Sequence, residues 1–160
     1  MKKIISTAIL IILTNSCDNK INLSLPSVFS DHMILQRDTE VSFWGKSMPN
    51  EKILISGSWG ISSSANADNS GKWELKLSTP SAGGPYEVVV NDSKNSIVYK
   101  DVLIGEVWLA SGQSNMQWKL NQCKDCLDNQ DEEIKNANYN EIRFFNNPMD
   151  LSGTIINSQK

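Results

Sequence analysis

Histidine and cysteine are scarce in this chain, which limits the sites that it can build. Its 160 residues include one histidine, His32, and three cysteines. A structural zinc site needs four ligands, and Cys123 and Cys126 with the distant His32 do not supply them in a recognisable spacing. The sequence therefore predicts no metal site.

The chain also lacks a basic stripe that could follow a nucleic-acid backbone. The formal net charge is −3, and the Lys and Arg residues are scattered. Nucleic acid is therefore excluded as an expected partner. The apolar fraction of 39% and the charged fraction of 21% are typical of a globular protein rather than a disordered one.

No apolar run at the N-terminus is long enough to span a bilayer. Lys2 and Lys3 precede the apolar run Ile4 to Leu13, the pattern of a signal peptide that covers residues 1–17. Leu13-Thr14-Asn15-Ser16-Cys17 resembles a bacterial lipoprotein processing site, in which Cys17 becomes the lipidated N-terminus. Lipid anchoring and plain secretion both stay open. Either one predicts export to the periplasm or cell envelope, with the membrane contacted only through the anchor.

Cys123 and Cys126 stand two residues apart in Cys123-Lys124-Asp125-Cys126. A redox role would need a thioredoxin-like context, which the sequence does not offer. We interpret the pair as a local disulfide or as two idle thiols in an exported protein.

Short β-prone runs dominate the region 21–100, which we predict to be an antiparallel β-sandwich domain. Glycine, proline and asparagine clusters separate these runs, including Ala82-Gly83-Gly84-Pro85. Alternation should place Trp73, Leu75 and Leu77 on one face of their strand. The expected strands are Met33–Leu35, Val41–Trp44, Lys52–Ile55, Lys72–Leu77, Tyr86–Val90 and Ile97–Tyr99.

The pattern changes near Asp101. The nearly unbroken apolar run Val102–Ala110 suggests a strand buried on both faces, as in a parallel sheet covered by helices. Met116–Asn138 is expected to be helical in part, and Glu141–Phe145 is expected to be a second strand. Strand, turn, helix and strand form the start of a βαβ unit, which cannot stand alone. We therefore predict a mainly β chain in which residues 101–160 begin an incomplete α/β domain.

A serine lies where this apolar run ends, in Ala110-Ser111-Gly112-Gln113-Ser114. A strand, a tight turn with glycine and then a helix is how α/β hydrolases present a nucleophilic serine. The alternative is that Ser114 is only a helix N-cap, since Gln117 follows three residues later and completes a capping box. Spacing alone favours the cap.

The motifs of the chain, taken in order, resemble those of the sialate O-acetylesterase family within the SGNH-hydrolase superfamily. Gly105-Glu106-Val107-Trp108 followed by Gly112-Gln113-Ser114-Asn115-Met116 is similar to the first motif of the family's flavodoxin-like hydrolase domain. The upstream likeness lies in Leu25–Arg37, Val41–Gly45, Gly71–Trp73, Gly83–Tyr86 and Asp101–Leu103. The likeness runs from about Leu23 to Phe145 and would make the chain an N-terminal fragment.

The resemblance implies a serine esterase that removes O-acetyl groups from sialic acid or another glycan. Ser114 would attack the acetyl carbonyl and its backbone N–H would hold the oxyanion, with Gly112, Gln113 and Asn115 supporting the turn. No metal or organic cofactor is implied. The family's Asp-x-x-His has no counterpart before Lys160, so we expect the fragment to be inactive alone.

His32 is not expected to replace the missing base. Its neighbour Asp31 would point to the opposite face of a strand and so could not orient the imidazole. We interpret His32 as a surface or interdomain residue. The alternative function from another class is an exported β-sandwich binding module, with Trp44, Trp59 and Trp73 either on a sugar-binding face or in packing.

Overall fold

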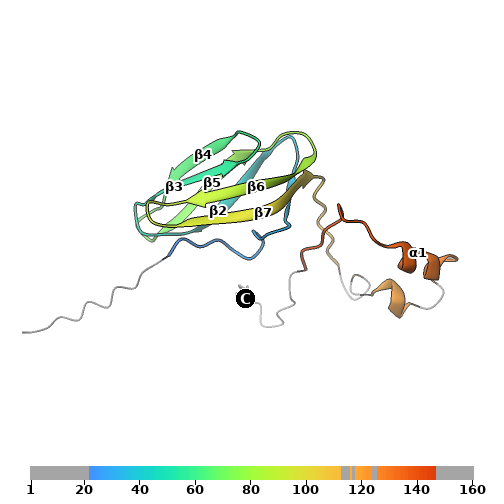
Figure 1. The fold of residues 1–160 in the computed structure, drawn as a ribbon. Coiled ribbons are helices and arrows are strands. Elements are labelled where there is room, and N and C mark those ends of the chain that lie inside the picture. The colour runs from blue at the N-terminus through green and yellow to red at the C-terminus, as the bar shows by residue number, and fades with distance from the viewer. Residues whose placement is uncertain (1–21, 113–115, 117, 124–125, 147–160) are drawn as a thin grey trace, which may run out of the picture.

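The computed structural model describes residues 22–112, 116, 118–123 and 126–146. Its strands form a five-stranded sheet in the order β1-β7-β6-β3-β4 and a two-stranded sheet of β2 and β5 (Figure 1). Strand bounds are β1 Ile34–Gln36, β2 Glu40–Lys46, β3 Lys52–Gly57, β4 Ser62–Asn66, β5 Lys72–Ser78, β6 Gly83–Asn91 and β7 Ser96–Gly105. The expectation of a mainly β chain is confirmed.

Alternating apolar side chains build the core between the two sheets. In β5, Trp73, Leu75 and Leu77 point inward while Lys72, Glu74 and Lys76 are exposed, as the sequence pattern predicts. The fully buried side chains from the facing strands include Phe43, Ile53, Ile55, Val88, Val90 and Val102. Burial of this set is the main stabilising contribution to the sandwich.

One pairing differs from the predicted antiparallel sandwich. Strand β1 runs parallel to β7, with Ile34 opposite Leu103 and Gln36 opposite Gly105. All other strand pairs of the two described sheets are antiparallel. Because of this parallel pairing, β1 lies beside the C-terminal end of β7, where the chain continues toward Ser114.

Strand β4 has no counterpart among the expected strands. Its sequence, Ser62-Ser63-Ser64-Ala65-Asn66, carries no β-branched or aromatic residue. It forms because all five residues pair with β3. The turn expected at Ala82–Pro85 is also wrong in part, since Gly83 to Pro85 open β6 with an irregular register.

The strand expected over Val102–Ala110 is wrong in its second half and in its environment. Val102–Gly105 are the end of β7 and pair with β6 and β1 of the sandwich. Residues 106–112 are in no strand and are exposed. Strand β7 therefore crosses the expected boundary between residues 100 and 101, and the division into two domains stays a prediction.

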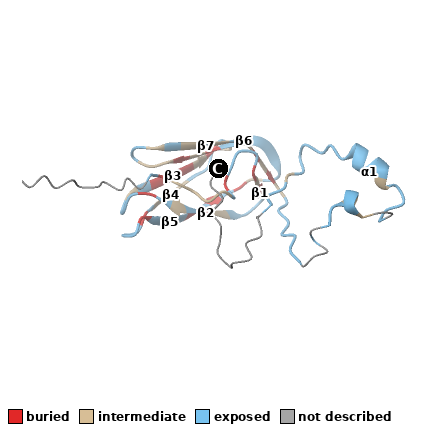
Figure 2. Ribbon diagram, turned by 90° about the horizontal axis from the view of Figure 1, so that it is seen from below, coloured by how far each residue is buried: buried red, intermediate tan, exposed pale blue. Residues whose placement is uncertain are grey.

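The later elements are also fewer than the sequence suggested. Over the described residues between 116 and 146, the helical residues are Met116, the 3-10 helix η2 (Leu120–Gln122) and the helix α1 (Gln130–Asn136). Neither η2 nor α1 contains a buried residue. The strand expected at Glu141–Phe145 is absent from the structure. Figure 2 shows this C-terminal part of the described chain almost wholly exposed. Its apolar side chains lack the covering layers that a parallel strand needs.

Candidate functional site

The approach to the serine turn is tied to the edge strand β1. The Gln36 side chain accepts a hydrogen bond from the Val107 backbone N–H (2.8 Å) and donates one to the Glu106 carboxylate (3.1 Å). The Arg37 backbone N–H donates to the Gly105 carbonyl oxygen (2.9 Å). The chain therefore leaves β7 in a fixed direction, although the strand itself ends at Gly105.

The turn is only partly described. Gly112 lies inside the described residues, and a Cβ added there would collide with the Met116 side chain. Gln113, Ser114 and Asn115, together with Gln117, lie outside the described residues. The nucleophile and the helix-cap interpretations of Ser114 both stay predictions, as does lipidation of Cys17, which also lies outside.

His32 has a carboxylate partner that the sequence analysis missed. Its Nδ1 lies 2.6 Å from Oδ2 of Asp101, and its side chain is 72% exposed. Both residues adopt positive φ angles, 64° and 52°. The adjacent Asp31 does not orient the ring, as expected, and instead accepts a hydrogen bond from the Lys100 N–H (2.8 Å).

Arg143 completes this cluster from the far end of the described chain. Its Nη2 lies 3.0 Å from each carboxylate oxygen of Asp101, and its Nη1 donates to the Asp101 carbonyl oxygen. The hydrogen bond from His32, followed by that from Arg143, lowers the pKa of Asp101 below its usual value. Asp101 thus remains an anion that joins β7, the loop before β1 and the segment around Arg143.

This cluster has no sequence signature that an inspection could have found. His32 and Asp101 are 69 positions apart, and Asp101 and Arg143 are 42 apart. The pairing follows from β1 lying parallel to β7, which brings the loop before β1 beside Lys100 and Asp101. Chemically the pair is an imidazole oriented by a carboxylate, but the structure does not relate it to Ser114.

The two remaining cysteines form a local disulfide, Cys123–Cys126, with Cα atoms 5.7 Å apart. This confirms the disulfide interpretation over two idle thiols. Among the described residues, no group of three or more His, Cys, Asp and Glu side chains gathers to hold a metal ion. No described helix is long and apolar enough to cross a membrane.

The three tryptophans of the β region have different environments. Trp73 is 3% exposed in the core. Trp59 packs edge-on against Tyr86 and donates to the Ser78 carbonyl oxygen (3.0 Å). Trp44 is 44% exposed on the outer face of β2. Packing and hydrogen bonding account for Trp73 and Trp59, whereas much of the Trp44 ring stays open to solvent.

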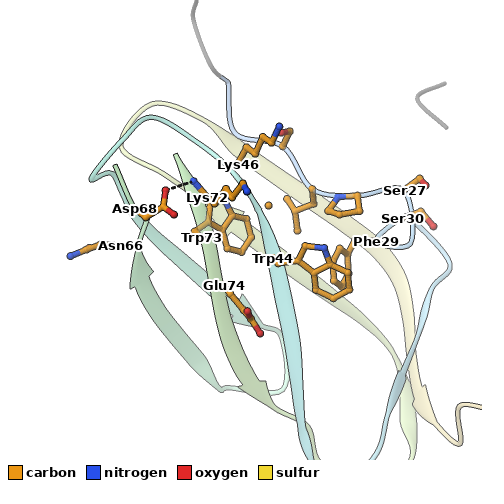
Figure 3. A pocket seen from close by; sticks show the side chains of 14 residues that line it. Ser27, Phe29, Ser30, Trp44, Lys46, Asn66, Asp68, Lys72, Trp73 and Glu74 are labelled. Atoms are coloured by element: carbon orange, nitrogen blue, oxygen red, sulfur yellow. Dashed lines mark hydrogen bonds between the residues drawn. The ribbon is translucent and has the colours of Figure 1, made fainter. Parts of the chain in front are cut away.

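Trp44 lies in a groove between the segment 24–30 and the outer face of β2 and β5 (Figure 3). The groove has a volume of about 1370 Å³. Charged and amide side chains from the two strands, from the end of β4 and from the turn before β5 line this groove. They are Lys46, Asn66, Asp68, Lys72 and Glu74.

No protein-family model matches the chain. It is similar to the mouse sialate O-acetylesterase, 28% identical over 148 residues, which covers 86% of this chain and 27% of that protein. It is 30% identical over 138 residues to the human sialate O-acetylesterase, covering 78% of this chain and 25% of that protein. The chain thus spans about a quarter of the length of the curated relatives that it matches.

A solved structure extends this similarity to the fold. A carbohydrate acetylesterase from Xanthomonas citri superposes with a TM-score of 0.60 at 40% sequence identity, over 65% of this chain and 24% of that chain. The sequence similarity and the shared fold lead to the same group of proteins, and this chain belongs to a sialate O-acetylesterase-like family.

Proposed function

We propose that the protein carrying this chain is a carbohydrate O-acetylesterase that uses Ser114 as its nucleophile. The observation that carries the proposal is the 40% identity to a carbohydrate acetylesterase over 65% of this chain. The fixed exit of β7 supports it, because Gln36 holds Val107 seven residues before Ser114. Holding the segment that precedes Ser114 limits the positions that its hydroxyl can take, and limited freedom of a reacting group favours reaction.

In the proposed reaction, Ser114 Oγ attacks the acetyl carbonyl carbon of an O-acetylated sugar. The Ser114 backbone N–H donates to the oxyanion that develops. The sugar hydroxyl leaves, an acetyl ester forms on Ser114, and water then releases acetate. The Ser114 hydroxyl needs a general base to take its proton. The only histidine of the 160 residues, His32, is hydrogen-bonded to Asp101 on the sandwich.

Acetate release from an aryl acetate tests the proposal. The comparison uses the 160-residue chain and a natural reading frame that continues past Lys160 and supplies an Asp-x-x-His. We expect turnover only from the longer chain, and Ser114→Ala should reduce it by several orders of magnitude. Ser111→Ala is the matched control, since it removes a hydroxyl from the same turn and should leave most of the rate.

Two outcomes would contradict the proposal. Full activity of the longer chain with Ser114→Ala would rule out Ser114 as the nucleophile. No acetate release from the longer chain would favour the binding-module alternative. Ser114-dependent turnover by the 160-residue chain would contradict only the expectation that this chain is inactive alone.

A further inference from the structure

The groove beside Trp44 holds polar side chains that the fold does not use. Lys46, Asn66, Lys72 and Glu74 line it, and within the described part of the chain none of these side chains has a hydrogen-bond or ion-pair partner. Asp68 differs, because its Oδ1 accepts bonds from Ser70 and from the Lys72 N–H and so closes the turn before β5. The hydrogen-bonding groups of these four side chains are therefore available to a ligand.

Trp44 presents an aromatic surface of fixed orientation. Its indole packs edge-on against Phe29, with ring centroids 4.9 Å apart. Phe29 is itself 7% exposed and stacks on the buried Phe43 at 4.7 Å. A pre-oriented ring loses little entropy when a flat, partly apolar ligand face stacks on it.

Two lysines at one end of the groove form no direct ion pair with a described residue, although the charge of Lys72 adds to the hydrogen bonds that lower the pKa of the nearby Asp68. Lys46 and Lys72 are directly opposite each other in the β2–β5 register, and both are exposed on the outer face. Like charges in such a pair are destabilising. By contrast, Lys76 on the same face of β5 lies 3.8 Å from Glu40. A bound carboxylate would offset the Lys46–Lys72 repulsion.

Hydrogen-bonding groups occur beside the aromatic ring. Glu74 is the direct cross-strand neighbour of Trp44, whereas Asn66 ends β4 of the other sheet. Figure 3 shows Trp44 beside Phe29, with Lys46 and Lys72 toward the same end of the groove as Asp68 and with Asn66 beyond Asp68. An indole, a carboxylate and an ammonium pair together match a sugar ring that has hydroxyls and one carboxylate.

We propose that this groove binds a sugar residue carrying a carboxylate. The pyranose ring stacks on Trp44, the sugar carboxylate lies between Lys46 and Lys72, and the Glu74 carboxylate accepts hydrogen bonds from the sugar hydroxyls. Sialic acids and uronic acids share this chemistry. The site does not depend on Ser114, so it stands or fails separately from the proposed esterase function.

Calorimetric titration of the 160-residue chain with methyl glycosides tests the proposal. The three ligands are the methyl glycosides of N-acetylneuraminic acid, of glucuronic acid and of neutral glucose. None of them is O-acetylated. We expect the acidic sugars to bind about tenfold more tightly than the neutral one, the effect of two exposed ion pairs. The ratio between the two acidic sugars distinguishes the sialic from the uronic class.

Substitutions in the groove test which side chains contact the sugar. Trp44→Ala should weaken binding of all three sugars by about tenfold, whereas Leu54→Ala should not. Leu54 is the matched control because it is 42% exposed on the other sheet. The double variant Lys46→Gln with Lys72→Gln should make acidic and neutral sugars bind alike, whereas Lys76→Gln should keep the difference.

Amide NMR spectra of each variant establish that the sandwich is folded before titration. Absence of binding by the unaltered chain would overturn the proposal. Equal affinity for acidic and neutral sugars would also overturn it, as would unchanged binding by a folded Trp44→Ala variant.

Discussion

Asp101 is the residue on which three distant parts of the described chain meet. It accepts from His32 and from Arg143, and it lies in β7 with a φ of 52°. A left-handed conformation is uncommon for a non-glycine residue and is tolerated where surrounding contacts determine it. The Arg143 guanidinium bonds both the backbone and the side chain of Asp101, which supplies such contacts.

Replacing Asp101 by Asn should release the segment around Arg143. The pKa of Asp101 is lowered by the His32 hydrogen bond and then by Arg143, so the folded-state pKa lies below the usual 3.8. The stabilisation is therefore complete above pH 3.8 and is lost as the pH falls through the lower folded-state value. NMR shifts of the Ile142 and Phe144 amides against pH should show this acid step in the wild type and lack it in the variant.

Asp128→Asn is the control for this titration, because Asp128 is exposed and no described residue bonds its carboxylate. It should keep the acid step. If Asp101→Asn gave the same Ile142 and Phe144 shifts as the wild type at every pH, Asp101 would not anchor this segment.

At the scale of elements, strand β2 accepts the N-terminal segment at Gly45. Ser24 and Lys46 exchange two backbone hydrogen bonds of 2.9 Å each. A Cβ on Gly45 would collide with the Ser24 carbonyl oxygen and lie 2.7 Å from the Trp73 ring. The close approach of this segment, which also forms one wall of the groove, therefore requires glycine.

Gly45→Ala should lower the free energy of unfolding by about 1–3 kcal/mol, because a hydrogen-bonded carbonyl cannot move aside. Denaturant unfolding measures the change. Gly105→Ala is the matched strand control, since its added Cβ would lie 3.3 Å from the flexible end of the Ile34 side chain, and it should cost less than about 1 kcal/mol. Equal losses for the two variants would contradict the close-approach argument.

At the scale of the whole molecule, burial changes sharply at the end of β7. Val102 and Ile104 are 0% and 2% exposed, whereas Trp108 and Leu109 are 86% and 93% exposed. The first pair belongs to the sandwich core, and the second pair belongs to a segment that no described layer covers (Figure 2).

Hydrogen exchange should therefore divide the apolar run Val102–Ala110 in two. The amides of Val102 to Ile104 should be protected like those of Val88 and Val90, because they share the same sheet. The amides of Trp108 to Ala110 should exchange orders of magnitude faster. Uniform protection across the run would mean that it is one continuous strand after all.

The sequence by itself determined the sandwich strands that carry β-branched or aromatic residues, since alternation and turn residues act locally. Through motif resemblance it also indicated the family, whereas it left a disulfide and two free thiols both open for Cys123 and Cys126. Trp73 and Glu74 were placed on opposite faces by the same rule of alternation.

Only the tertiary structure decided the rest. Strand β4 exists because β3 offers it a hydrogen-bonding edge, and its serines gave no local signal. The His32–Asp101–Arg143 cluster and the groove around Trp44 join residues that only sheet pairing brings together. The apolar run after Asp101 is buried or half-buried up to Ile104 and exposed over residues 106–110. Burial depends on which other layers cover a strand, and the hydrophobicity of the chain alone does not show this.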